Sequence, residues 1–280
     1  MTEIISSILY YNAYSDNDIK PGMKRLNLGT KFNISYLPFG ITHIIVTILT
    51  KYQSYMVNYL PHSIISLEYY STKYLNTNKL PASILILNLP AVHLNNLPPF
   101  LKANMIMQPE LSQYQHDSEL NNLPLNIKYC WISIILYKNI NLHFQGNLYK
   151  NITHLGLFNG LDTILSNLHK LSNLKILYLN YFHHFIDNIN TIANCTKLEH
   201  IFINYGLYYR HNFELNDFIK IKQLNNSKSL KQITLLLDEY EEYSDDNINF
   251  NKISETLLYC KIKKMKYKSI YDHFIDEISI

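Results

Sequence analysis

Two stretches in the second half of the chain, LSNLKILYLNYF (171–182) and CTKLEHIFINYG (195–206), share one order of apolar and polar residues. In each, an apolar residue is followed by a second three positions later and by a third five positions later. These residues are Leu174, Leu177 and Leu179, and then Leu198, Ile201 and Ile203. Alternation with a period of two is typical of a strand that buries one face. We therefore interpret the two stretches as copies of one repeated unit.

The same frame recurs along most of the chain. It occurs eleven times, at intervals of 17 to 32 residues, in units that begin at Met23, Ile41, Ile64, Ile84, Leu101, Ile127, Ile152, Leu174, Leu198, Leu230 and Leu257. Asn104 is the one polar residue at a framed position. A period of about 20 to 29 residues is that of leucine-rich repeats, whose units bury their apolar sides only by stacking.

This repeat predicts the fold class. We expect an α/β repeat solenoid, a leucine-rich-repeat-like horseshoe with a parallel β-sheet of about ten or eleven strands on its concave face. Its buried core should include Leu155, Leu157, Leu177, Leu179, Ile201 and Ile203.

The segments that return from one strand to the next differ between the two halves. In the first half a Leu-Pro pair precedes the frame, as at Leu60-Pro61 and Leu80-Pro81, and all nine prolines lie between positions 21 and 124. Proline stiffens a turn, so we expect extended or turn-like returns there. In the second half helical spacing predicts short helices, carried by Leu165, Leu168 and Leu171, by Ile189, Ile192 and Cys195, and by Phe218, Ile221 and Leu224.

The first half also resembles a known repeat family. LNLGTKFNI (26–34) followed by Leu37-Pro38, with HSIISLEY (62–69) and ASILILNL (82–89) after their own Leu-Pro pairs, resembles the FNIP repeat, a leucine-rich-repeat variant with the pattern LPxSLxxLxLGxxFN. The resemblance covers roughly Met23 to Ile132. The family is abundant in some amoebae and large DNA viruses, and its members often carry an N-terminal F-box, which would imply a ubiquitin-ligase adaptor. The 22 residues before Met23 are too few for an F-box, so we expect none.

These observations predict one continuous solenoid. We divide it into an N-terminal cap (1–22), FNIP-type repeats (23–151), leucine-rich repeats with loop excursions (152–268) and a C-terminal helical cap (269–280). Polar loops are expected at 108–122, 205–217 and 238–246.

Composition disfavours several classes of function. The net charge of +3 is too weak to draw nucleic acid or an anionic membrane by itself. The seven glycines lack phosphate-loop spacing, and Cys130, Cys195 and Cys260 form no C-x-x-C pair. We expect no cofactor, no metal site and no enzymatic activity. The start MTEIISSILYYNAYS lacks the basic residues of a signal peptide, and no apolar run reaches about 18 residues, so we expect an intracellular, cytoplasmic protein.

The residues between the framed positions point to the opposite face of the sheet and form a candidate binding surface. They are Tyr129, Trp131, His154, Gly156, Phe158, Tyr178, Asn180, His200, Phe202 and Asn204. Aromatic residues are favoured as anchors at protein interfaces, but they also favour strands in general, and both interpretations stay open. His154 and His200 lie two strands apart, about 10 Å, too far to share a metal. Trp131 and Tyr178 share a column with Gly156 between them, which predicts a notch for a partner's side chain.

The sequence favours a non-enzymatic protein–protein interaction module. Nucleic-acid binding is an alternative, through the basic run KIKKMKYK (261–268) with its lysines Lys261, Lys263, Lys264, Lys266 and Lys268. The other interpretation of that run is a terminal strand whose lysines guard the sheet edge against aggregation. A third possibility is a substrate-recognition subunit of a ubiquitin-ligase-type assembly without its own F-box. We expect a protein partner, no nucleic acid and no membrane.

Overall fold

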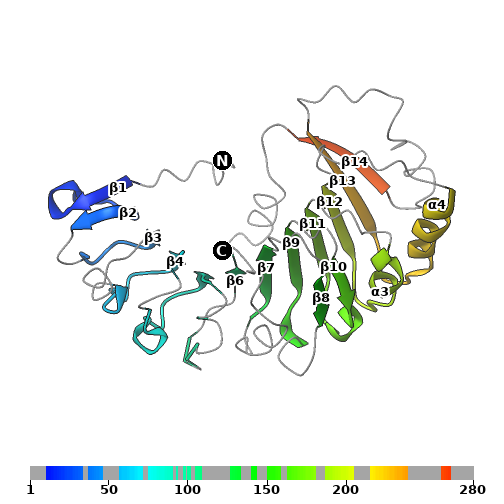
Figure 1. The fold of residues 1–280 in the computed structure, drawn as a ribbon, viewed down its shortest axis with the longest axis horizontal. Coiled ribbons are helices and arrows are strands. Elements are labelled where there is room, and N and C mark those ends of the chain that lie inside the picture. The colour runs from blue at the N-terminus through cyan, green and yellow to red at the C-terminus, as the bar shows by residue number, and fades with distance from the viewer. Residues whose placement is uncertain are drawn as a thin grey trace.

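A computed structural model of the chain defines the fold (Figure 1). It describes residues 11–33, 37–46, 57–71, 75–90, 93, 97–98, 100–101, 105–108, 127–133, 140–143, 150–158, 163–180, 187–204, 215–238 and 260–265. The predicted C-terminal cap (269–280) lies outside these residues, as do nearly all of the predicted polar loop 108–122 and most of the loop 238–246.

Twelve of the described strands form one sheet, and every neighbouring pair is parallel. The strands are β1 (Tyr11–Ser15), β2 (Arg25–Asn33), β3 (His43–Val46), β4 (Ser66–Tyr69), β5 (Ile86–Asn88), β6 (Met105–Gln108), β7 (Tyr129–Ser133), β9 (His154–Phe158), β11 (Ile176–Asn180), β12 (His200–Asn204), β13 (Gln232–Asp238) and β14 (Cys260–Met265). Their order in the sheet is their order in the chain. Parallel strands in sequence order with few helices are what a repeat solenoid requires.

The second framed residue of each unit lies beside its counterpart on the next strand. This line runs through Leu26, Ile44, Leu67, Leu87, Ile106, Cys130, Leu155, Leu177, Ile201, Ile233 and Cys260. Asn104 was assigned to this line from the sequence, and that assignment is wrong, because Ile106 occupies the position. Two additional residues separate Leu101 from β6, so the frame there is displaced by two.

The first described strand, β1, extends the sheet into the segment 1–22. β1 pairs with β2 so that Tyr11 lies beside Leu26 and Ala13 beside Leu28. Ala13 is fully buried in the core. The sequence carries the frame here too, as Ile8, Tyr11 and Ala13. Repeated strands therefore begin within 1–22, and the sheet has more strands than the ten or eleven predicted.

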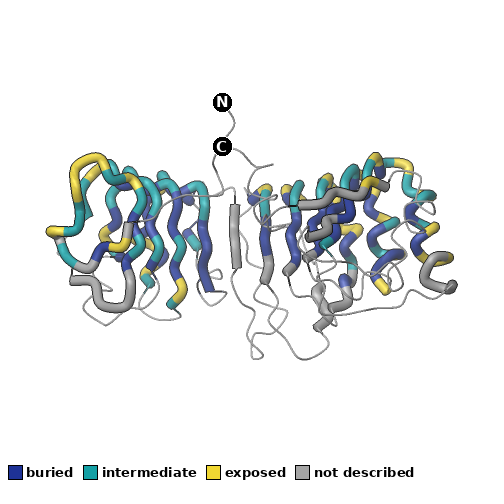
Figure 2. Tube along the Cα trace, turned by 90° about the horizontal axis from the view of Figure 1, so that it is seen from above, coloured by how far each residue is buried: buried dark blue, intermediate teal, exposed yellow. Residues whose placement is uncertain are grey.

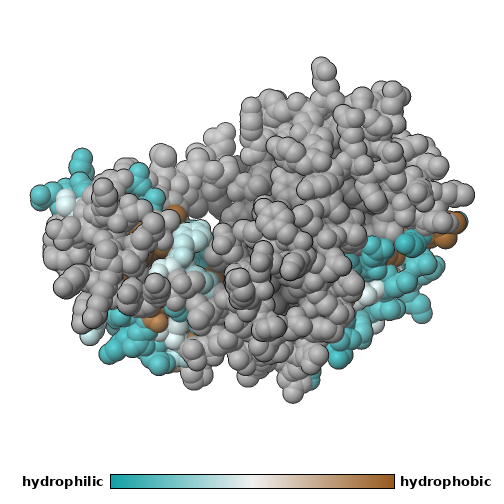
Figure 3. Space-filling model, in the orientation of Figure 1, coloured by the Kyte–Doolittle hydropathy of each residue, from teal (hydrophilic) through white to brown (hydrophobic). Residues whose placement is uncertain are grey.

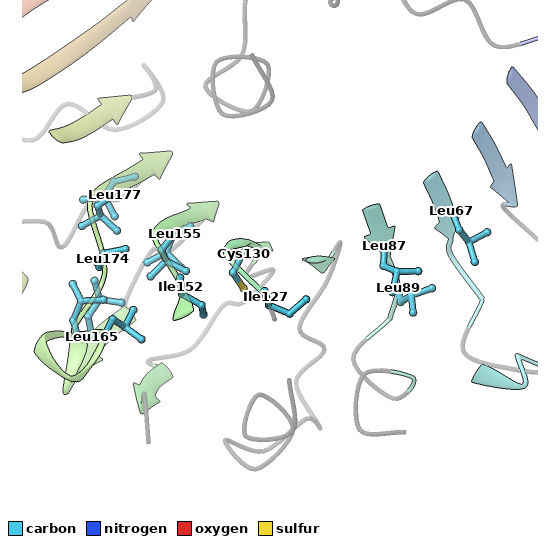
Figure 4. Close-up of a cluster of buried hydrophobic side chains, with 14 of the residues drawn as sticks. Leu67, Leu87, Leu89, Ile127, Cys130, Ile152, Leu155, Leu165, Leu174 and Leu177 are labelled. Carbon is cyan, nitrogen blue, oxygen red and sulfur yellow. The ribbon is translucent and has the colours of Figure 1, made fainter. Parts of the chain in front are cut away.

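The framed residues form the hydrophobic core (Figure 4). Leu155, Leu157, Leu177, Leu179, Ile201 and Ile203 are all buried, as predicted. In Figure 4 Leu155 and Leu177 come from neighbouring strands, and Leu165 and Leu174 lie on the same side of the sheet. Figure 2 shows buried stretches along successive strands and exposed ones mainly at turns. Each unit thus buries its apolar side against the next.

Several of the strands begin after a recurrent turn. The N–H of Ile64 donates to the Pro61 carbonyl (3.1 Å), and that of Leu174 donates to the Leu171 carbonyl (2.9 Å). Just before β3, Gly40 has φ +107°, a conformation that side chains rarely adopt. Its N–H donates to Ser63 Oγ in the following turn (3.1 Å). Proline in the first half and leucine in the second therefore support the same turn.

The returns of the second half contain helices and one extended pairing. α3 (Ile189–Ala193), α4 (Leu215–Lys222), η5 (Leu168–Lys170) and η7 (Gln223–Asn226) supply the expected helices. Leu165 lies instead on β10 (Thr163–Ser166), which pairs with β8 (Ile140–His143) in a separate two-stranded sheet. Its N–H donates to Asn188 Oδ1 (2.6 Å), just before α3. A neighbouring extended return thus overrides the helical spacing.

Other described short elements complete the fold. The first half has the 3-10 turns η1 (Asp16–Asp18) and η2 (Thr77–Lys79). α4 begins at Leu215, inside the stretch 205–217 that was predicted to be a loop.

In Figure 3 the described surface on the right, where Figure 1 places α3 and α4, is mostly hydrophilic. Among the described residues no helix is long and apolar enough to cross a membrane.

We expect Leu177→Ala to lower the free energy of unfolding by about 2 to 5 kcal/mol, because it removes transfer energy and leaves a cavity. Leu177 is fully buried, whereas Lys175, immediately before the same strand, is exposed. Lys175→Ala is therefore the matched control and should change stability by less than about 0.5 kcal/mol. Urea unfolding of both variants measures the difference, and equal effects would contradict the assigned core.

Candidate functional site

One column of the face opposite the core carries most of the large rings of the candidate surface. Paired positions place Trp131, Gly156, Tyr178, Phe202 and Thr234 side by side on β7, β9, β11, β12 and β13. We call these five residues the ring column. The sequence-based expectation that Gly156 separates Trp131 from Tyr178 is confirmed. The degree to which this column is open to solvent decides what it can bind.

Trp131 fills the notch that was predicted at Gly156. A Cβ atom added to Gly156 would fall among the Cε3, Cζ3 and Cδ2 atoms of the indole. The indole thus lies over the glycine backbone, and Trp131 is 5% exposed. A tryptophan ring exceeds the strand spacing of about 4.8 Å, so it leans onto a neighbouring strand that has no side chain in its way. The prediction of an open notch between Trp131 and Tyr178 is wrong.

The other rings of the ring column pack on one another. Tyr178 and Phe202 stack with centroids 4.8 Å apart and planes 7° apart. Tyr178 is 0% and Phe202 5% exposed, and Thr234 beside them is also buried. Aromatic pairs of this kind contribute to stability beyond their buried area. The ring column therefore belongs to the packed interior, and Trp131, Tyr178 and Phe202 do not form an exposed binding patch.

A second column on the same face remains partly accessible. Tyr129, His154, Ile176, His200 and Gln232 occupy paired positions on five neighbouring strands and are all half-buried. We call these five residues the open column. The rings of Tyr129 and His154 lie 4.8 Å apart at 49°. The two columns occupy different positions along the strands, and their exposure to solvent differs accordingly.

Three more of the sequence-predicted site residues lie near the ends of their strands. Asn180 pairs with Asn204 and with Phe158, so the three share a third column. Asn204 is half-buried. The side chains of Phe158 and Asn180 lie outside the described part of the chain, and only their backbones place them here.

A threonine fixes the orientation of His154 in the open column. Thr153 Oγ1 donates to the Lys128 carbonyl (3.2 Å) and lies 2.8 Å from His154 Nδ1. Because the hydroxyl has a single proton, Nδ1–H is then the donor to Oγ1, which leaves Nε2 as an acceptor. Burial, and to a lesser extent the charge of the Lys175 ammonium, lower the pKa of His154 to about 4. His154 is therefore a neutral ring at pH 7.

The same arrangement occurs on β3. Thr42 Oγ1 donates to the Lys24 carbonyl (3.1 Å) and lies 2.9 Å from His43 Nδ1. Burial, and then the Arg25 charge, lower the pKa of His43. Sequence reasoning missed both pairs, although ITHI (41–44) and ITHL (152–155) repeat at the same place in the frame. That repetition is the signal that could have found them.

Cys130 and Cys195 are unsuited to nucleophilic chemistry. Burial raises the pKa of Cys130 and of Cys195 to about 12. A thiol acts as nucleophile or metal ligand in its deprotonated form, which is scarce at neutral pH when the pKa is so high. Among the described residues no three His, Cys, Asp or Glu side chains are close enough to hold a metal ion.

The basic run at the end of the chain lies on the last strand of the sheet. β14 pairs with β13 and follows it in the strand order, which makes it an edge strand among the described elements. That is the position that the edge-guarding interpretation requires. Lys261, Lys263 and Lys264 belong to this strand, and Lys266 and Lys268 lie outside the described residues.

The contact between Trp131 and Gly156 predicts a strong energetic coupling. We expect Gly156→Ala to destabilise the fold by about 1 to 3 kcal/mol, because the new methyl group displaces the indole. After Trp131→Ala the same change should be neutral or stabilising, since alanine suits a strand better than glycine. A double-mutant cycle by urea unfolding should give a coupling of about 0.5 to 3 kcal/mol. A coupling near zero would contradict the contact.

The depressed pKa of His154 predicts acid-dependent stability. The unfolded chain takes up a proton near pH 6.5 and the folded chain only near pH 4. Stability should therefore fall as the pH drops through that window. His43 and His93, whose pKa values are also lowered, act in the same direction. We expect His154→Asn to flatten this decline in unfolding experiments between pH 7 and 4, and an unchanged slope would contradict it.

Comparison with known proteins adds no family to this description. No protein-family model and no curated protein matches the chain. The proposals below therefore rest on the residues of the chain and their geometry.

Proposed function

We propose that the chain is a non-enzymatic protein–protein interaction module. The observation that carries the proposal is the open column, five half-buried side chains in register across neighbouring strands of a continuous sheet. A stacked repeat offers an extended and rigid surface, which is the property that such proteins use in binding. Rigid strands also lower the ordering cost of association.

We further propose that the units are leucine-rich repeats, FNIP-like in the first half, and that the sheet lines the concave side of a horseshoe. The recurrent turn before several strands, the Leu-Pro pairs of the first half and the register kept from strand to strand support this assignment. On this assignment the open column lies on the concave surface. The ring column lies beside it on the same face and packs as structural support.

The chemistry of the open column suits a protein partner. Tyr129 supplies a flat apolar ring with a polar tip, a combination that is common in binding surfaces. His154 is neutral, so its Nε2 can accept a hydrogen bond from a partner. His200 and Asn204 add polar groups on the same strand, β12. The accessible candidate residues are therefore Tyr129, His154, His200 and Asn204.

Affinity capture from the native cell, followed by binding measurements on the captured protein, tests this function. We expect the double variant Tyr129→Ala/His200→Ala to weaken binding by at least about tenfold, since aromatic anchors dominate interfaces. Its thermal midpoint should change little, because partly exposed side chains contribute little to folding.

Asn190→Ala/Lys222→Ala is the matched control for this experiment. Both residues are exposed and lie on the return segments, at α3 and α4. The control should bind at full affinity. If the open-column variant folds and retains full affinity as well, the partner does not use the open column.

A further inference from the structure

A row of mostly basic side chains crosses the sheet at the beginning of its strands. Lys128, Thr153, Lys175, Glu199 and Lys231 occupy the same position in successive units. The carbonyl of each of the first four accepts the N–H of the next, at 2.8 Å in every case. Successive members are therefore about one strand spacing apart, and Lys128, Lys175 and Lys231 follow at intervals of roughly 10 Å.

The turns before these strands contribute further exposed lysines. We define the basic edge as the seven exposed lysines that the turns and strand beginnings of these units contribute: Lys128, Lys150, Lys170, Lys175, Lys197, Lys228 and Lys231. Glu199 pairs with Lys231 at 2.6 Å, and Lys197 donates to Asn173 Oδ1 at 2.6 Å. Within the described part of the chain the other five lysines have no ion pair.

The charges of the basic edge act on neighbouring ionisable groups. A hydrogen bond from Lys231, and the charges of Lys231 and Lys175, lower the pKa of Glu199. Lys175 also lowers the pKa of His154. Both shifts have the direction that nearby positive charge produces.

The same edge in the first half is different. Lys24, Thr42, Ile65 and Leu85 occupy the row position on consecutive units there, and the carbonyls of the first three accept the corresponding hydrogen bonds. Lys24 is the one basic residue among these four. The near-neutral net charge of +3 therefore hides a local concentration of positive charge over β7 to β13. Such a concentration steers and binds an oppositely charged partner.

We propose that the basic edge binds an acidic segment of a partner protein, laid across the turns that precede β7 to β13. The inference rests on the proposed function and adds to it a second surface and the chemistry of the segment that this surface takes. An extended chain advances about 10 Å in three residues, so carboxylates at every third position match the intervals between Lys128, Lys175 and Lys231.

The composition of the edge favours a polypeptide over a phosphate polymer. Proteins that bind single-stranded nucleic acid stack bases on aromatic side chains. The turns 150–153, 167–175, 194–199 and 227–231 contain no aromatic residue apart from His169. Glu199 lies within the row, where its negative charge would repel a uniformly anionic polymer or membrane. A polypeptide can place an uncharged or basic residue opposite it.

Fluorescence anisotropy with the full chain and a labelled peptide of ten glutamates tests the proposal. We expect binding at low ionic strength that weakens as salt is added. The triple variant Lys128→Gln/Lys150→Gln/Lys175→Gln should bind at least about tenfold more weakly, since neutralising charges at an interface removes both steering and contact. The matched control Lys20→Gln/Lys24→Gln/Lys79→Gln changes three lysines of the first half and should bind within about twofold of the original chain. Thermal midpoints verify that both variants are folded.

Several results would overturn the proposal. They are the absence of peptide binding, an equal loss in the control variant, or tighter binding of a ten-residue oligouridine or of phosphatidylserine vesicles than of the peptide. The outcome is independent of the captured partner. Failure of the peptide with retained dependence on Tyr129 and His200 would refute the basic edge alone, and the reverse would refute the open column alone.

Discussion

The parallel register of the second framed residue is the constraint on which the rest of the structure depends. Leu155, Leu177 and Ile201 lie beside one another on neighbouring strands and are fully buried. A slip of one residue would move every apolar side chain of a strand to the other face. Because each unit packs only against its neighbours, the core is continuous only while this line is unbroken. Two additional residues precede β6 in the sequence, and the line is nevertheless kept, because Ile106 pairs with Leu87 and with Cys130.

The same register organises both surfaces of functional interest. Residues at one position of the frame necessarily form a row across the sheet. The residue types that successive units carry at that position therefore determine the chemistry of the row. Tyr129 and His154 meet in the open column for this reason. Lys128 and Lys175 join the basic edge for the same reason. The net charge of the chain does not reveal the basic edge, because it sums over all residues regardless of where they lie on the surface.

The ring column shows how a surface position becomes interior. Alternation correctly placed Trp131, Tyr178 and Phe202 on the face opposite the core, yet all three are buried. Alternation specifies the side of the sheet on which a residue lies, but solvent exposure also depends on what lies beside it. Rings wider than the strand spacing lean on neighbouring strands, and here Trp131 covers Gly156 while Tyr178 stacks on Phe202.

Sequence alone determined the repeat, the parallel order of the strands and the buried framed residues, because these follow from a short periodic pattern. It missed β1, whose frame ends in the small residue Ala13, and it assigned Leu165 to a helix, although a neighbouring return draws that residue into β10. Only the tertiary structure decided which residues of the outer face are accessible. That property depends on contacts between residues more than twenty positions apart, such as Trp131 with Gly156 and Tyr178 with Phe202, which no local pattern encodes.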